Sequence, residues 1–126
     1  MTLLSDPSSA AARSPRAGAM WTASLAGIAI WIVHITAEAA LVPYAEQHHD
    51  AVYLMHALTL VLALAAAACA LWCLRLARAA SSGEEEWSTG GRTAFIGWFG
   101  AITGCVSVVL IIVEGVYVAT ITIGRT

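Results

Sequence analysis

The chain has 126 residues, of which 60% are hydrophobic and only 11% are charged. All six basic residues are arginine, eight residues are acidic, and the net charge is −2. Soluble domains carry about 25% charged residues and a nucleic-acid binder needs a basic face, so this composition excludes both classes. It predicts a single integral membrane domain with an all-α fold.

The predicted elements begin with a tail. Residues 1–18 contain several Ala and Ser residues and few acidic ones, which predicts a disordered cytoplasmic tail. In the membrane domain that follows, residues 19–126, three apolar runs are each long enough to cross a hydrocarbon core of about 30 Å. We therefore predict transmembrane helices at about 20–43, 51–78 and 94–122, packed as a three-helix bundle.

The arginines predict the orientation of this bundle. Five of them lie in the N-terminal tail and around the second loop, whereas the first loop has none and only Arg125 follows the third helix. The positive-inside rule then places the N-terminus in the cytoplasm and the C-terminus outside.

Four ionisable residues lie within the predicted spans: His34 and Glu38 in the first, His56 in the second and Glu114 in the third. An ionised group at the centre of a bilayer costs about 2.5–3.5 kcal/mol on insertion scales, so such residues indicate a functional site or a shared hydrogen-bond network. We treat these four residues as the predicted intramembrane polar cluster.

Depth and helical phase both favour this cluster. Glu38, His56 and Glu114 each lie five or six residues inside the outer end of their span, which is about 8–9 Å below that edge. His34 lies one turn deeper than Glu38 on the same face, and Trp31 continues that face. The polar residues predicted to support the cluster on the inner faces are Thr59, Thr103, Ser107 and Tyr117.

Several chemistries fit these residues. The simplest is structural, with neutral or paired side chains bonded across the helices and no cofactor. The other interpretations are a transition-metal site built from His34, Glu38, His56 and Glu114, a haem b held by the two histidines, and a protonatable or quinone-facing site. A small transporter or proton conductor is a further class, and it would need an oligomer.

The motifs themselves favour packing over catalysis. The sequence has no nucleophile elbow, P-loop or dinucleotide-binding fingerprint, so an enzyme is not expected. Gly100-x-x-x-Gly104 is a small-residue pattern that lets membrane helices approach closely. It predicts tight packing within the bundle or against a partner.

The positions of several polar residues also resemble the pattern of a known protein family. Trp31 and His34 are followed by Leu41-Val42-Pro43-Tyr44, by Leu54-x-His56 with Thr59, and by Glu114-Gly115. Over residues 21–118 this pattern resembles a family of small three-helix bacterial inner-membrane proteins encoded near cytochrome c oxidase and its assembly factors. The histidines match the family pattern, whereas position 114 is usually an amide there and position 38 is not usually acidic.

The resemblance implies a respiratory setting and a bacterial cytoplasmic (inner) membrane. We therefore expect a multi-pass, non-catalytic accessory subunit or assembly helper of a respiratory terminal oxidase, with membrane-protein partners or further copies of itself and no nucleic acid. The alternative is a small haem- or metal-binding redox protein that uses the His/Glu cluster near the outer side of the membrane.

Overall fold

The computed structural model describes residues 17–48, 50–81 and 90–123. They form three helices and no strand: α2 (Ala17–Ala45), α3 (Asp50–Ser81) and α4 (Gly90–Ile123). Each contains a segment long and apolar enough to cross a membrane. The predicted all-α fold with three spans is thereby confirmed, while the predicted tail falls almost wholly outside the described residues.

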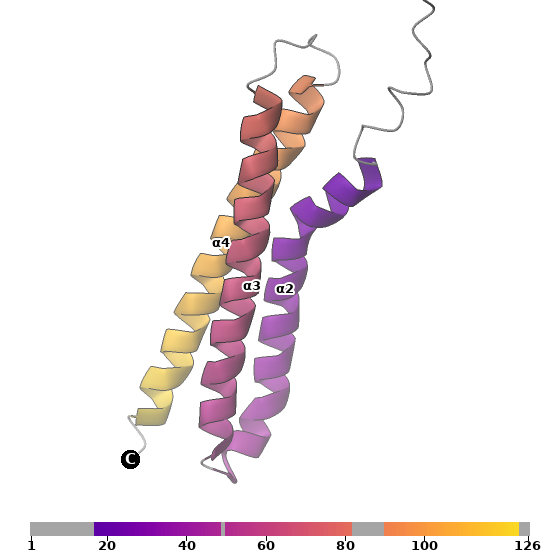
Figure 1. Cartoon of the computed structure of the whole chain (residues 1–126). Coiled ribbons are helices and arrows are strands. Elements are labelled where there is room, and N and C mark those ends of the chain that lie inside the picture. The colour runs from indigo at the N-terminus through magenta and orange to yellow at the C-terminus, as the bar shows by residue number, and fades with distance from the viewer. Residues whose placement is uncertain (1–16, 49, 82–89, 124–126) are drawn as a thin grey trace, which may run out of the picture.

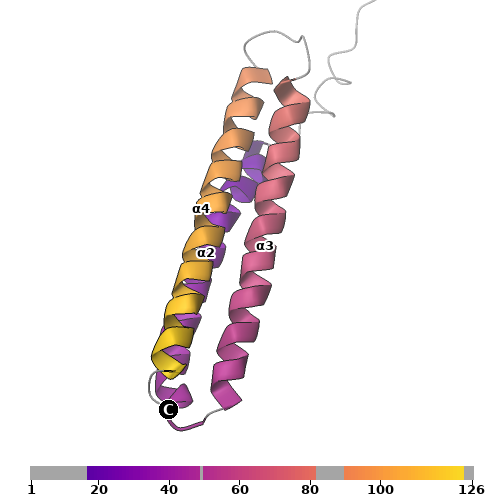
Figure 2. The ribbon, with the colours of Figure 1, turned by 90° about the vertical axis from the view of Figure 1, so that its left-hand side faces the viewer.

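The helices lie side by side as an up-down-up bundle in which every pair is in contact (Figures 1 and 2). α2 and α4 run in the same direction and α3 runs against them. A short connection joins α2 to α3, where the His48 amide donates to the Tyr44 carbonyl at 3.1 Å. We call this the turn end of the bundle, and we call the opposite end, where α3 ends and α4 begins, the arginine end.

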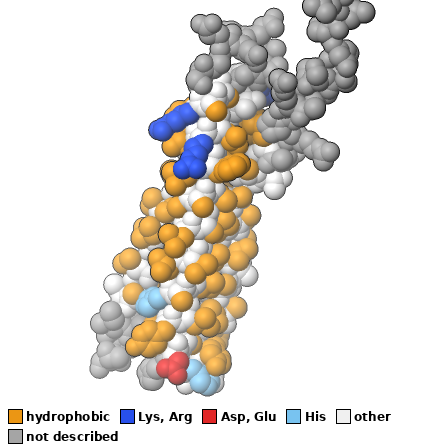
Figure 3. All heavy atoms as spheres, viewed as in Figure 1, with side chains coloured by type: hydrophobic (Ala, Val, Ile, Leu, Met, Phe, Trp, Pro, Cys, Tyr) orange, Lys and Arg blue, Asp and Glu red, His pale blue; other side chains and the backbone are white. Residues whose placement is uncertain are grey.

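All three helices extend beyond the ends expected from the apolar runs. α2 continues past Pro43 to Ala45, although proline lacks the amide hydrogen for one intrahelical bond. The apolar run predicts the stretch that suits a bilayer core, whereas polar residues at either end can prolong the same helix. Figure 3 shows basic side chains near the arginine end and an apolar surface over much of the visible face below them.

Large apolar side chains cover the outside of the bundle and small ones fill much of its inside. Exposed residues include Leu60, Leu64 and Val109, whereas Ala66 and Ala77 are fully buried. This distribution suits a lipid environment, because hydrocarbon accepts large apolar side chains and close helix contact requires small ones.

A region that we call the small-residue crossing brings the three helices together. A Cβ atom added to Gly104 would lie 2.8 Å from the Ala70 Cβ and 3.1 Å from the Ala70 Cα. One added to Gly27 would lie 2.8 Å from the Gly104 Cα. These approaches leave no room for a side chain at either glycine. The crossing consists of Ser24, Gly27, Ala70, Cys73, Gly100 and Gly104.

Candidate intramembrane polar site

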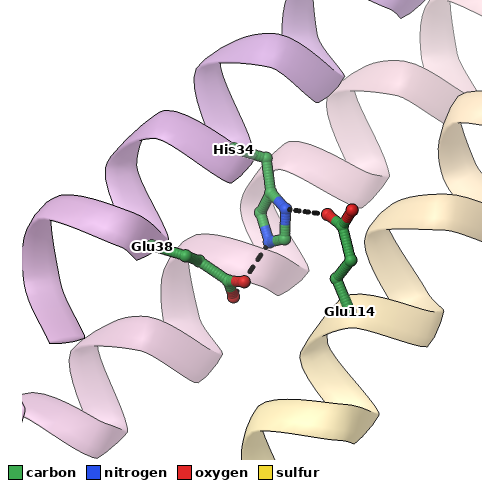
Figure 4. A group of neighbouring side chains, drawn as sticks. All are labelled: His34, Glu38 and Glu114. Carbon is green, nitrogen blue, oxygen red and sulfur yellow. Dashed lines mark hydrogen bonds and ion pairs between the residues drawn. The ribbon is translucent and has the colours of Figure 1, made fainter.

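His34 is the centre of a polar cluster within the spans. Its side chain is fully buried, and its imidazole ring lies between the carboxyl groups of Glu38 and Glu114 (Figure 4). Glu38 follows His34 by four residues on α2, so the helical repeat places both side chains on one face. Glu114 reaches the ring from α4. The cluster that the structure defines contains Trp31, His34, Glu38, Thr59 and Glu114.

The Nδ1 side of the ring faces Glu114. His34 Nδ1 lies 3.2 Å from Glu114 Oε2, and the Trp31 indole donates from Nε1 to Glu114 Oε1 at 3.2 Å. Both carboxyl oxygens of Glu114 therefore have a nitrogen partner on α2. The side chain still keeps 27% of its surface exposed, so this part of the cluster reaches the outside of the bundle.

The Nε2 side of the ring faces Glu38 and Thr59. His34 Nε2 lies 3.2 Å from Glu38 Oε1 and 3.1 Å from the Thr59 hydroxyl oxygen. The Thr59 hydroxyl contacts Glu38 Oε1 at 3.1 Å and the Met55 carbonyl oxygen at 3.0 Å. Thr59 is thus the residue through which α3 enters the cluster, and all three helices are joined at this level.

The arrangement limits where the protons lie. A neutral imidazole has a single N–H, yet both ring nitrogens of His34 face a carboxyl group. With its hydrogen on Nδ1 donated to Glu114, a neutral ring can accept from the Thr59 hydroxyl at Nε2. Hydrogen bonds from the ring to both acids at once require either an imidazolium between two carboxylates or a proton on one of the acids. Among the described residues, no buried side-chain nitrogen or oxygen lacks a hydrogen-bond partner. The cluster can therefore clamp the helices while its polar atoms stay satisfied.

The structure brings together three of the four predicted cluster residues and leaves His56 out. The side chain of His56 is exposed on the surface of α3, and the inward position belongs to Thr59. Residues three positions apart differ by about 60° around a helix, which is enough to turn one of them away from the interface. The predicted inward orientation of His56 is corrected accordingly.

The predicted supporting residues are divided among three places. Thr59 belongs to the cluster itself. Thr103 donates to the Ser24 carbonyl at 3.1 Å and Ser107 donates to the Thr103 carbonyl at 2.8 Å, so these two residues belong with the small-residue crossing. Tyr117 is 65% exposed on α4 and does not face inward as predicted.

Trp31 is the member that the sequence identified only as part of the helical face. The signal that points to it is spacing, because Trp31 lies one turn before His34 and so lies on the same side of α2. Its indole N–H is a donor that must find an acceptor within an apolar environment, and Glu114 provides one at 3.2 Å.

The donor set is suited to binding a cation. One ligand atom each from His34, Glu38 and Glu114 lies within 4.8 Å of the others, and imidazole with carboxylate is a common metal-binding combination. The two histidines do not form the facing pair that a shared haem needs, since one is buried and the other is exposed. Comparison with protein-family models, with curated proteins and with solved structures gives no match for this chain.

Proposed function

We propose that the chain is a non-catalytic accessory subunit or assembly helper of a larger membrane complex. The observation that carries the proposal is that ionisable groups within the spans reach the outside of the bundle. The Glu114 side chain is 27% exposed and His56 is exposed as well. Contact with lipid at this depth is costly for such groups, and a partner helix with matching polar atoms removes that cost.

The respiratory terminal oxidase is the complex that we propose as the partner, on the strength of the sequence resemblance alone. The positive-inside rule further supports an orientation in a bacterial cytoplasmic membrane with the arginine end in the cytoplasm. Arg75 and Arg78 lie near the end of α3 and Arg92 lies near the start of α4, so all three belong to that end. In this orientation the N-terminus is inside, and the polar cluster lies in the outer half of the bilayer.

Photo-crosslinking in cells tests the proposal. A photoreactive amino acid at position 117 is placed one turn from Glu114, and the same amino acid at position 95 provides the matched control. Tyr117 and Phe95 are both 65% exposed on α4, but Phe95 lies toward the arginine end. We expect a discrete protein adduct from position 117 that contains an oxidase subunit, and a different or weaker pattern from position 95.

Extraction in a mild detergent provides the second measurement. We expect the chain to migrate on a native gel with haem-containing oxidase subunits. A chain that migrates as a lone monomer and forms only lipid adducts at position 117 would contradict the accessory role. A discrete partner that lacks any oxidase subunit would contradict the respiratory assignment while leaving the accessory role in place.

A further inference from the structure

Three atoms of the polar cluster form a nearly equilateral triangle. His34 Nε2 and Glu38 Oε1 are 3.2 Å apart, and the Thr59 hydroxyl oxygen lies 3.1 Å from each of them. The atoms come from two helices, α2 and α3, and all three carry lone pairs. We call this set the ligand triangle.

The ligand triangle contains more contacts than hydrogens. The Thr59 hydroxyl has one hydrogen for two acceptors, Glu38 Oε1 at 3.1 Å and the Met55 carbonyl oxygen at 3.0 Å. An N–H at Nε2 of His34 would likewise be shared between Glu38 Oε1 and the Thr59 oxygen. With Glu38 ionised, at most two hydrogens serve these four contacts, so each hydrogen is shared and lone pairs of all three atoms converge at the triangle.

The spacing also matches a metal coordination sphere. Bonds of about 2.1 Å in tetrahedral or octahedral geometry set neighbouring ligand atoms about 3.0–3.4 Å apart. The edges of the triangle, 3.1 and 3.2 Å, fall within that interval. A cation above the plane of the triangle could therefore contact all three atoms with little movement of the helices, and further positions would stay open to water or a second carboxyl oxygen.

Nδ1 of His34 faces a carboxyl group, as the non-coordinating ring nitrogen of a metal-binding histidine commonly does. Glu114 Oε2 lies 3.2 Å from His34 Nδ1, and the Trp31 indole holds the second oxygen of Glu114. A carboxylate in this position keeps the hydrogen on Nδ1 and leaves Nε2 free to coordinate. Glu114 then orients the histidine from outside the coordination sphere.

Charge selects a divalent ion. With a neutral imidazole and both carboxyl groups ionised, the cluster would hold a charge of −2 within the spans, and the described arginines belong to the arginine end. A divalent cation cancels that charge where an uncompensated one is costly. Imidazole combined with oxygen ligands suits Zn²⁺, Fe²⁺ and Mn²⁺. We propose that His34 Nε2, Glu38 and Thr59 bind a divalent transition-metal ion, independently of any accessory role.

Metal titration of the purified full-length chain tests this site. The protein is isolated in detergent with an affinity tag that contains no histidine, is stripped with a chelator, and is titrated with Co²⁺ and, separately, with Zn²⁺. We expect one Co²⁺ per chain with visible d–d absorption, and one Zn²⁺ by elemental analysis. We expect Glu38→Gln to lower the affinity at least 100-fold, and Glu114→Gln to lower it about 10–100-fold, as for other residues that support a ligand.

His56→Gln is the matched control, because His56 has the same side chain within the same bundle but lies outside the cluster. We expect this variant to bind as the wild type does. Thr59→Ser keeps the hydroxyl and should bind, whereas Thr59→Val should bind several-fold more weakly, and this pair carries the test if a charged-residue variant fails to fold. No saturable binding by the wild type, or wild-type affinity in a folded Glu38→Gln variant, would overturn the proposal.

Discussion

The small-residue crossing and the polar cluster both join α2, α3 and α4, but they do so by different means. At the crossing, glycines allow backbones to touch, and a Cβ on Gly27 would lie 2.8 Å from the Gly104 Cα. In the cluster, polar side chains span the distance, as where His34 lies 3.2 Å from Glu114. The crossing depends on the absence of side chains at the glycines, whereas the cluster depends on the polar side chains that are present. Substitutions at the two places should therefore fail in different ways.

Filling the crossing should have the largest effect on stability. In Gly104→Leu the new side chain would begin 2.8 Å from the Ala70 Cβ, and the Ala70 Cα at 3.1 Å is backbone that cannot rotate away. Overpacking typically costs about 1–3 kcal/mol, and contact with backbone should bring this variant to at least about 3 kcal/mol. The measurement is the free energy of unfolding in a detergent–SDS titration followed by far-UV circular dichroism.

Gly91→Leu is the control for that substitution. A Cβ atom at Gly91 has nothing within 4 Å, and leucine favours a helix more than glycine does. The control should therefore be as stable as the wild type or slightly more so. Equal losses in the two variants would mean that steric fit at the crossing does not hold the helices together.

Removing the centre of the cluster should have the next largest effect. His34→Leu takes away the partner that Glu38 and Glu114 share, and it leaves both acids within the spans. Removing one partner of a buried ion pair costs about 3–5 kcal/mol in soluble proteins. We expect about 2–3 kcal/mol here, because Glu114 is part-exposed and keeps its bond to Trp31.

The titration for His34→Leu is carried out in the presence of a chelator, so that the hydrogen bonds are measured without any bound metal. His56→Leu is the matched control and should change the free energy of unfolding by less than about 0.5 kcal/mol, because the side chain is exposed. A larger loss in His56→Leu than in His34→Leu would contradict the arrangement of the cluster.

The sequence was sufficient for the fold and for part of the site. The length and hydropathy of three runs predict three helices, because a bilayer leaves an apolar chain few other structures. The four-residue spacing of His34 and Glu38 places them on one face, and the depth of Glu114 predicts its meeting with them. Each of these inferences depends on length or on a helical repeat within a single segment.

The choice between His56 and Thr59 could not be made in that way. α3 is rich in Ala and Leu on every side, and lipid accepts apolar side chains as readily as the interior does. The hydrophobic pattern therefore leaves the rotation of α3 open by the 60° that separates these two residues. Small residues decide it, since the Gly115 backbone fits against Thr59 and that of Gly104 fits against Ala70.

Thr103→Val should have the smallest effect, and it tests whether the crossing depends on fit alone. The Thr103 hydroxyl donates to the Ser24 carbonyl of α2 at 3.1 Å, but it shares its one hydrogen with two carbonyls of its own helix, those of Phe99 at 2.9 Å and Gly100 at 3.2 Å. Hydrogen bonds between membrane helices average about 0.6 kcal/mol, and sharing should keep this one at or below that value. Unfolding titrations of Thr103→Val and of Thr36→Val provide the measurement.

Among the described residues, the Thr36 hydroxyl donates only to the Ile32 carbonyl of its own helix at 2.8 Å, so its valine variant measures the loss of a hydroxyl that joins none of the described helices. A difference of about 0.6 kcal/mol or less between the two variants means that the crossing is held by the absence of side chains, with polar atoms adding little. A difference of 2 kcal/mol or more would show that the crossing also depends on hydrogen bonding, and the contrast with the His34 cluster would then be one of degree.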